Sequence, residues 1–391
     1  MKNILLHLKN FFNRIDRPYT PRHWMAVIVI ASLAILTLPA ALTLVLDPFM
    51  RYHAPFAWAM PEFSREYYQI PGVLRHFDYD TVLVGSSMSQ NFRVDEFEAA
   101  LGGKAVKATA RGLLPATGRL FVEIAEESRH GEVRRVYWAL DILTFNADRD
   151  AHYCPLPDYI YSGNHLYDVQ YWWNWTLLSD YYPVWLKPRI VRNYKKRDRH
   201  LIRTDPARMF CWDYRAEPTG LEAMAAAARE EPLSFAQIMP EKANESVRRN
   251  LLETVRRYPE TEFTFFFSPY SVYFWCAMKE TGCIDSALKF RETLAEELLA
   301  EPNVRLYDFS RAREHICNVE EYKDMTHFTG VQNSWMTRCF ADGSFRAETP
   351  EEVRRGNQEI LRLADEFMDR FRAEFPPPAR AKQRFSHLVE R

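Results

Sequence analysis

An uncharged apolar run near the N-terminus limits most strongly how this chain can fold. From Trp24 to Leu46 the sequence has 23 residues without a charge. At about 1.5 Å per residue, a helix of this length crosses a hydrocarbon core of roughly 30 Å. The run is longer than the apolar segment of a cleavable signal peptide, the alternative that the small residues at 39–41 leave open. The sequence therefore predicts a retained transmembrane helix over 24–46.

Charged residues before this run set its expected orientation. One aspartate, Asp16, stands among five basic residues, which are Lys2, Lys9, Arg14, Arg17 and Arg22. Because positive charge is retained on the inner side, residues 1–23 are predicted to be cytoplasmic. Everything after Asp47 is then extracytoplasmic, on the periplasmic side of the inner membrane. Residues 1–13 are compatible with an interfacial amphipathic helix or with a frayed basic tail.

The composition excludes several classes of protein. The chain has 391 residues, 47% of them hydrophobic, and a formal net charge of −1. These values are typical of a folded globular protein and exclude wholesale disorder. A dedicated nucleic-acid binder usually has a clear basic excess, so no nucleic-acid partner is expected.

The six cysteines leave two alternatives open. In an oxidising compartment they permit disulfides, and Cys276 and Cys283 are close enough in sequence to close a small loop. Buried free thiols are the other interpretation. Because no Cys-x-x-Cys pair is present, a thiolate zinc site is not expected, and the sequence predicts neither a metal nor a cofactor.

Strand and helix patterns alternate after a connector at 47–78. The predicted strands cover 79–84, 104–108, 133–140, 262–267 and 304–307. The predicted helices cover 116–129, 246–257, 284–300 and 350–374. Such alternation indicates one α/β domain over 79–375, with a mostly parallel sheet covered on both faces. A Pro-rich basic tail follows at 376–391.

Residues 146–245 interrupt this alternation and are predicted to be an insertion. Between Tyr153 and Trp185, 11 of 33 residues are Tyr or Trp. Sugar-stacking platforms, membrane-interface belts, protein interfaces and plain core packing all use such rings. Between Lys187 and Arg203 the net charge is +7. A solvated helix face, anionic lipid headgroups and an acidic polymer are the interpretations of that run.

A candidate nucleophile follows the first predicted strand of the domain. The strand leads into Gly85-Ser86-Ser87-Met88-Ser89. A glycine permits a sharp turn, and a serine at the entry to a helix would lie where unpaired N–H groups stabilise an oxyanion. The same residues are also common in turns and helix caps.

A candidate base lies near the end of the domain, in Asp324-Met325-Thr326-His327. A serine hydroxyl needs a base that accepts its proton, and the base needs a partner that fixes its tautomer. Asp-x-x-His supplies both from one loop. Taken alone, the motif is also compatible with a metal site, although no third ligand accompanies it.

Together the two motifs resemble the SGNH/GDSL hydrolase superfamily. Gly85-Ser86-Ser87-Met88 stands in place of Gly-Asp-Ser-Leu, so the resemblance implies that Ser87, rather than Ser86, is the nucleophile. Asp324 and His327 match the last motif of the superfamily. The resemblance also implies a three-layer α/β/α fold and an oxyanion hole formed by the N–H groups of Ser87 and Gly112.

One position departs from that superfamily. Its third motif usually supplies an asparagine to the oxyanion hole, but here Asp141 stands near that place. An ionised carboxylate would repel an oxyanion, so Asp141 is expected to be protonated, turned away or used otherwise. Asn146 and Asn91 are alternative donors, and the sequence does not choose between them.

The architecture is also similar to DltD-type proteins and to SGNH-domain partners of membrane-bound O-acyltransferases. Ser-Pro-Tyr-Ser at 268–271, Thr-His-Phe at 326–328 and Asn-Ser-Trp at 333–335 add to this similarity. It implies an extracytoplasmic serine acyltransferase or esterase that acts on a cell-envelope polysaccharide or glycolipid beside such a membrane partner. The alternative is a catalytically silent subunit that docks the acyltransferase and presents polymer.

Overall fold

The computed structural model describes residues 20–129, 131–190, 203–212, 218–230, 234–375 and 379–380. A six-stranded sheet with the order β2-β1-β3-β5-β6-β7 forms its centre. The first five of these strands are parallel, and β7 is antiparallel at the edge. This confirms the predicted α/β class. The strands are β1 Thr81–Gly85, β2 Ala105–Thr109, β3 Arg135–Leu140, β5 Glu262–Phe267, β6 Val304–Asp308 and β7 Arg346–Ala347.

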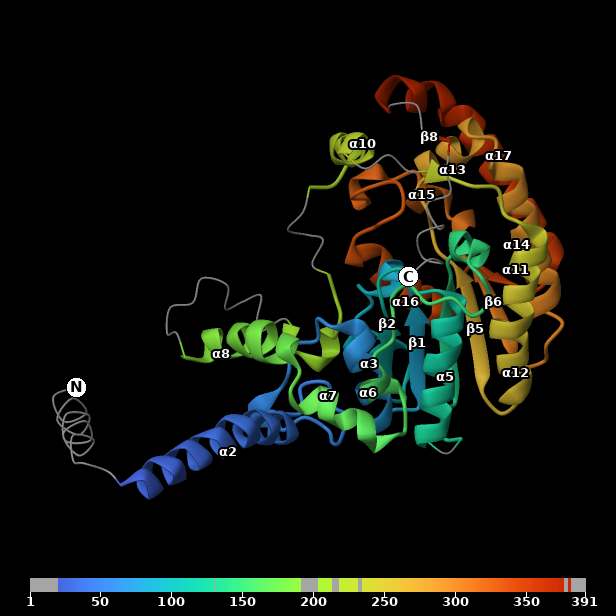
Figure 1. The fold of residues 1–391 in the computed structure, drawn as a ribbon. Coiled ribbons are helices and arrows are strands. Elements are labelled where there is room, and N and C mark those ends of the chain that lie inside the picture. Colours follow the sequence, from blue (N-terminus) through green and yellow to red (C-terminus); the bar gives the residue numbers. More distant parts are fainter. Residues whose placement is uncertain are drawn as a thin grey trace.

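Successive side chains of a strand point to opposite faces of the sheet. Because the strands are apolar on both faces, helices cover both. Tyr137 of β3 packs against Phe97 and Phe340 on one face, with ring centroids 4.8 and 5.0 Å away. Trp138 packs against Gly118 on the other face, where an added Cβ would lie 2.3 Å from the indole ring. Figure 1 shows the resulting layers. The helices of these layers include α4 Val94–Leu101, α5 Pro115–Arg129, α14 Ile284–Leu298 and α16 Gly330–Asp342.

Most strongly periodic helices lie where the sequence predicts them. The α5, α14 and α17 (Pro350–Glu374) helices agree with the predicted ranges to within two residues. The helix expected at 246–257 begins earlier, because α11 (Pro240–Val247) continues through a π-turn at Arg248–Leu252 into α12 (Glu253–Arg257). Residues 240–245, which the sequence analysis placed in the insertion, are therefore part of the helical layer.

Several helices were not anticipated, and α3 (Glu66–His76) is the most consequential. It lies in the segment interpreted as a connector, yet Ile70, Val73 and Leu74 are completely buried in the main core. The α/β domain therefore begins before residue 79. The other unanticipated helices of this domain are α4, α13 (Val272–Glu280), α15 (Arg313–Ile316) and α16, together with 3₁₀ turns at 142–146, 309–311 and 319–321.

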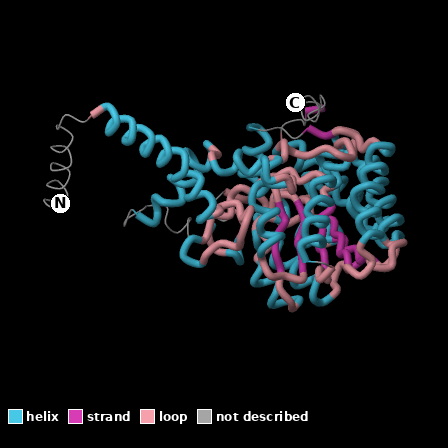
Figure 2. The backbone as a smooth tube through the Cα atoms, turned by 60° about the horizontal axis from the view of Figure 1, so that its bottom comes forward, coloured by secondary structure: helices cyan, strands magenta, loops and turns pink. Residues whose placement is uncertain are grey.

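The N-terminal apolar run forms a helix, as predicted. Helix α2 extends over Pro21–Leu46, with a mean hydropathy of 2.5 in its most apolar window, and projects away from the domain (Figures 1 and 2). It is long and apolar enough to cross a membrane. A membrane anchor and a signal sequence both satisfy this test. Residues 1–13, for which a helix or a basic tail was expected, and most of the segment predicted to be cytoplasmic lie outside the described residues.

The aromatic insertion forms a second, smaller hydrophobic core with the end of α2. Leu46, Phe49, Tyr171, Tyr181 and Trp185 are among its buried residues. Most of the basic run at 187–203 and most of the tail at 376–391 lie outside the described residues. The described part of the insertion contains α6 Asp158–Tyr161, α7 Asp168–Trp172, a π-turn at Leu177–Tyr181, α8 Tyr182–Ile190 and α10 Leu221–Glu230, and its β4 (Ser234–Phe235) pairs with β8 (Ala379–Arg380) of the tail.

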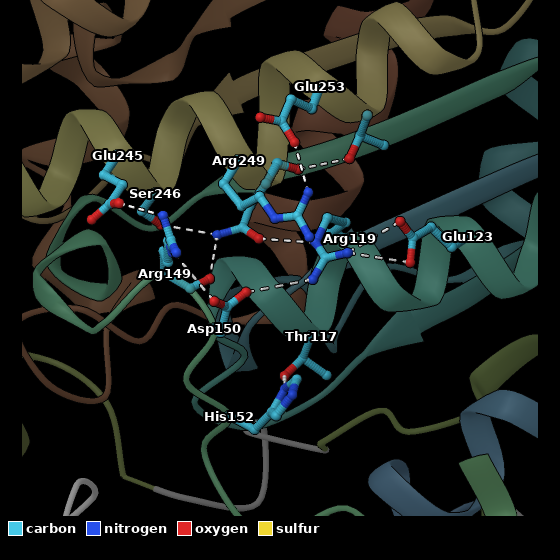
Figure 3. A network of polar contacts seen from close by, with 12 residues as sticks. Thr117, Arg119, Glu123, Arg149, Asp150, His152, Glu245, Ser246, Arg249 and Glu253 are labelled. Atoms are coloured by element: carbon cyan, nitrogen blue, oxygen red, sulfur yellow. Dashed lines mark hydrogen bonds and ion pairs between the residues drawn. The ribbon is translucent and has the colours of Figure 1, made fainter. Parts of the chain in front are cut away.

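A polar network fastens the start of the insertion to the α/β domain (Figure 3). The buried Asn250 donates to the carbonyl of Arg149 at 2.8 Å and accepts from Arg119 of α5 at 3.1 Å. Thr117 and His152 are hydrogen-bonded at 2.8 Å. The chain therefore leaves the sheet along a fixed path before it enters the aromatic core.

Candidate active site

The predicted nucleophile lies where β1 ends, at the carboxyl edge of the parallel sheet. The chain turns so sharply after β1 that a Cβ on Gly85 would lie 2.4 Å from the hydroxyl of Ser89. Glycine at 85 is therefore required by the close approach of these two residues. Ser86 is buried, whereas Ser87 is half-buried and faces the loop that carries His327.

The turn after Ser87 corrects one expectation. Ser87 begins a 3₁₀ turn of three residues rather than an α-helix, and α4 starts only at Val94. The buried ammonium of Lys107 donates to the carbonyls of Gln90 and Phe92 at 2.6 and 2.8 Å. Lys107 thus satisfies two carbonyls in the segment between the turn and α4. Because the turn at Ser87 has only three residues, it provides no large helix dipole, and individual N–H groups would have to stabilise an oxyanion.

The predicted base lies on a tight loop that is fastened to the end of β5. An antiparallel bridge between Tyr322 and Phe328 closes the loop. The Tyr322 hydroxyl donates to the Pro269 carbonyl at 2.6 Å, and the Ser271 hydroxyl donates to the Met325 carbonyl at 2.8 Å. The Ser-Pro-Tyr-Ser segment thus holds this loop over the edge of the sheet.

The structure brings Ser87, His327 and Asp324 together. The Ser87 Oγ lies 2.8 Å from the His327 Nε2, across 240 residues of sequence. The His327 Nδ1 lies 2.8 Å from Oδ2 of Asp324. Oδ1 of Asp324 accepts the backbone N–H groups of Thr326 and His327 at 2.8 and 2.7 Å. The imidazole is therefore oriented with one nitrogen toward the carboxylate and the other toward the serine, as nucleophilic catalysis requires.

The electrostatics of this pair also suit a base. Burial alone would raise the pKa of Asp324, but the charge of His327 and the hydrogen bonds to that residue lower it to about 2. Burial would lower the pKa of His327, but the charge and hydrogen bond of Asp324 outweigh it and raise the pKa. Asp324 is therefore ionised at neutral pH, and it stabilises the imidazolium that would form on proton transfer. Ser87, His327 and Asp324 form a hydrogen-bonded relay. The side chain of His327 is 32% exposed, so this relay can be reached from solvent.

Asp141 is not part of this relay. Its carboxylate accepts the hydroxyl of Tyr270 at 2.5 Å and is hydrogen-bonded to Ser86. Burial raises the pKa of Asp141, while the bonds to Tyr270 and Ser86 oppose that shift. Two hydroxyl groups therefore engage the Asp141 side chain. The carboxyl group also fixes the serine that precedes the predicted nucleophile.

The two candidate asparagines have structural partners. Both polar atoms of the Asn146 side chain bind the chain before α11, at the Gln237 carbonyl (3.0 Å) and the Met239 N–H (2.9 Å). The side-chain oxygen of Asn91 accepts the N–H of Trp212 at 2.8 Å. The side-chain amides of Asn146 and Asn91 therefore both hold backbone groups of other segments.

Gly112 lies at the same edge of the sheet as Ser87. It follows β2, whose Thr109 is the register partner of Gly85. Its φ of +63° is in the left-handed region, and an added Cβ would lie 2.4 Å from the ring of Tyr153. Glycine is thus needed both for the turn and for the aromatic ring packed on it. Its role as an oxyanion donor stays a prediction.

Sequence reasoning missed the residues that position the relay. Besides Tyr270, Ser271 and Tyr322, Asn333 of α16 donates to the Met88 carbonyl at 3.0 Å and so holds the turn that carries Ser87. Tyr270, Ser271 and Asn333 lie in segments 268–271 and 333–335, for which the sequence indicated only a resemblance to other proteins. Their function as supports depends on contacts between distant segments, which spacing in the sequence does not reveal.

Other site types have less support. Among the residues that the structure describes, no cluster of three or more His, Cys, Asp or Glu side chains could hold a metal ion. The six cysteines, all within the described ranges, are free thiols. The converging side chains suit acyl transfer to and from a serine.

Comparisons with known proteins add little to this geometry. No family model and no curated protein matches the chain. One solved structure, described as a "putative platelet activating factor from Streptococcus pneumonia", aligns with a TM-score of 0.35 at 10% identity. The alignment covers 74% of this chain and 94% of that one. At this level of similarity the neighbour supports no argument about activity.

Proposed function

We propose that this protein is a membrane-anchored serine acyltransferase or esterase that uses Ser87 as its nucleophile. The observation that carries the proposal is the continuous relay from the Ser87 hydroxyl through His327 to Asp324, with both contacts at 2.8 Å. Of the described residues, these three converge from two distant segments onto a partly exposed edge of a parallel sheet, which is where α/β enzymes place their chemistry.

The proposed reaction has two half-steps. His327 accepts the proton of Ser87 while Oγ attacks the carbonyl carbon of an acyl donor, and His327 then protonates the leaving alkoxide. An acceptor hydroxyl next gives its proton to His327 while its oxygen attacks the carbonyl carbon of acyl-Ser87. The bond between that carbon and Oγ breaks, and His327 returns the proton to Ser87. With water as acceptor the reaction is ester hydrolysis, and with a sugar hydroxyl it is transfer. The N–H groups of Ser87 and Gly112 are the proposed oxyanion donors.

The proposed location follows from α2 and the charges that precede it. With α2 retained as an anchor and its N-terminus inside, the relay faces the extracytoplasmic side of the inner membrane. A cell-envelope polysaccharide or glycolipid is the proposed acceptor. A membrane-bound O-acyltransferase is the proposed partner and source of the acyl group.

An activity-based probe tests the central claim. A fluorophosphonate should label wild-type protein at Ser87, because only an activated serine attacks phosphorus readily. Peptide mass spectrometry locates the adduct, and p-nitrophenyl esters report turnover. Ser87→Ala should abolish both signals without unfolding the domain, whereas Ser344→Ala, at an exposed turn, should leave both unchanged.

The opposite result would favour the other candidate. If folded wild-type protein neither reacts with the probe nor turns over esters, Ser87 is inert. The chain would then be better described as a binding or assembly subunit that presents polymer to its partner.

A further inference from the structure

The described surface has an unusual concentration of exposed apolar side chains next to α2. Beyond α2, twelve large hydrophobic side chains of the described residues are exposed. Seven of these lie between residues 166 and 190, and two more lie at 56 and 58. Trp175 is 76% exposed and Leu166 is 82% exposed. Apolar patches of this kind on a folded protein usually mark a surface that another phase or partner covers.

We propose that this surface is a second membrane contact, which lies on the outer leaflet beside the anchor. We call it the apolar shoulder and define it by Phe56, Trp58, Leu166, Val169, Trp173 and Trp175. The inference rests on the proposed anchoring through α2. The lipid bilayer covers the apolar shoulder. Three observations support this, which are the height of the shoulder along α2, its attachment to α2 and the chemistry of its side chains.

The first reason is that the shoulder lies beside the span itself rather than beyond it. The indole N–H of Trp173 donates to the backbone carbonyl of Leu36 at 2.7 Å. Leu36 lies ten residues before the end of α2, which corresponds to about 15 Å along the helix axis. Because the predicted span covers 24–46, a ring at this height lies beside the membrane-crossing part of the helix, within the depth of the bilayer.

The second reason is that the shoulder is joined rigidly to the anchor. The buried carboxylate of Asp47, at the end of α2, accepts the hydroxyl of Tyr171 at 2.7 Å and the N–H of Tyr52 at 2.7 Å. Arg51 and Asp168 form an ion pair of 3.2 Å whose side chains are only 7% and 5% exposed. When α2 is in a membrane, these contacts hold the shoulder at a fixed height.

The third reason is the chemistry of the surface. Tryptophan is enriched at membrane interfaces, because its ring is apolar while its N–H group can hydrogen-bond at the headgroup level. Phe56 and Trp58 stack with ring centroids 5.7 Å apart. The shoulder meets α2 at the contact between Trp173 and Leu36, and Leu38, Leu42 and Val45 farther along α2 are exposed as well. One lipid phase can therefore cover both surfaces.

Fluorine NMR of the full chain in lipid nanodiscs tests the proposal. The protein is labelled with 5-fluorotryptophan, and Trp24→Phe, Trp138→Phe and Trp175→Phe assign three resonances. A phosphatidylcholine with a spin label near the headgroup should cause loss of the Trp175 and Trp24 resonances. It should leave that of Trp138, which is buried against α5. A water-soluble gadolinium chelate should affect Trp175 less than the lipid label does.

The outcomes separate the shoulder from the anchor. The lipid label could remove the Trp24 resonance but not that of Trp175, while gadolinium affects Trp175. This result would contradict the proposed lipid contact of the shoulder and would still support the anchor. If neither resonance responds to the lipid label, both the anchor and the shoulder fail. Protection of Trp175 from both reagents would indicate a second copy of the chain on this surface and would also overturn the lipid contact.

Discussion

At the scale of single residues, the relay depends on supports that take no part in proton transfer. Asp324 is fixed by two backbone N–H groups of its own loop, and the hydroxyl of Tyr322 fixes that loop on Pro269. The relay is therefore preorganised, which is the property that lets a serine act as a nucleophile. The protonation state of His327 controls whether Ser87 can react, so it can be followed through the reactivity of Ser87.

The pH dependence of labelling should show this state. Only the neutral imidazole accepts a proton, so fluorophosphonate labelling of Ser87 should rise with pH through the pKa of His327. Because Asp324 raises this pKa above the ordinary value of 6.5, half-maximal labelling is expected above pH 6.5.

Replacement of the carboxylate should move that profile. In Asp324→Asn, burial acts on His327 without an opposing charge, so its pKa falls and the midpoint shifts to lower pH. The plateau should also fall, because the tautomer is no longer fixed. Asp369→Asn, on the exposed face of α17, is the control and should keep the wild-type profile. An unchanged midpoint in Asp324→Asn would contradict the assigned pair.

At the scale of elements, close contacts between helix and strand fix the edge on which the site is built. Helix α5 approaches β3 at Gly118, where the ring of Trp138 occupies the space of a side chain. Because β3 also leads to Asp141, a displacement of α5 would move residues at the site as well as in the core. Packing density in protein interiors leaves little room for such a change.

A single methyl group should test this packing. Gly118→Ala would place a Cβ 2.3 Å from the indole of Trp138 and is expected to destabilise the domain by about 1–3 kcal/mol. Gly163→Ala is the matched control, because no atom lies within 4 Å of the added group. Chemical denaturation measures both variants. Equal stability of the two would show that α5 and β3 adjust without cost.

At the scale of the whole molecule, the described residues form two hydrophobic cores. The main core surrounds the sheet, and the smaller one joins the end of α2 to the aromatic insertion. The buried ion pair between Arg51 and Asp168 belongs to the smaller core. The relay belongs to the larger one, so the two parts should respond differently to damage.

Loss of the buried arginine should loosen only the smaller core. Arg51→Ala leaves the Asp168 carboxylate without its main cation, and breaking a buried pair costs about 3 kcal/mol or more. Hydrogen exchange should accelerate in residues 159–185 while β1 and β3 stay protected. Labelling of Ser87 should be retained. Arg93→Ala, in an exposed pair, should change exchange little, and faster exchange throughout the sheet would indicate a single cooperative unit.

The sequence by itself determined the elements whose signals are local. The apolar run of α2, the strands β1, β3 and β5 and the helix α17 were all predicted within a few residues. Helix α2 and the buried strands are nearly continuous apolar runs, and α17 repeats apolar residues along one face. Helix α4 has only eight residues, α16 has a weak apolar pattern, and α3 lies in an aromatic, Pro-containing segment. Their helical state depends on packing against the sheet.

The same distinction holds for the site. Gly85, Ser87, Asp324 and His327 could be selected because their two local motifs together resemble one superfamily, whereas each motif alone has other uses. Their meeting across 240 residues was decided by tertiary structure, through contacts such as Ser271 with Met325. The short turn after Ser87 and the partners of Asp141 were decided in the same way. Hydrogen bonds between distant segments form only when the sheet has aligned the strand ends, and no pattern within one segment encodes them.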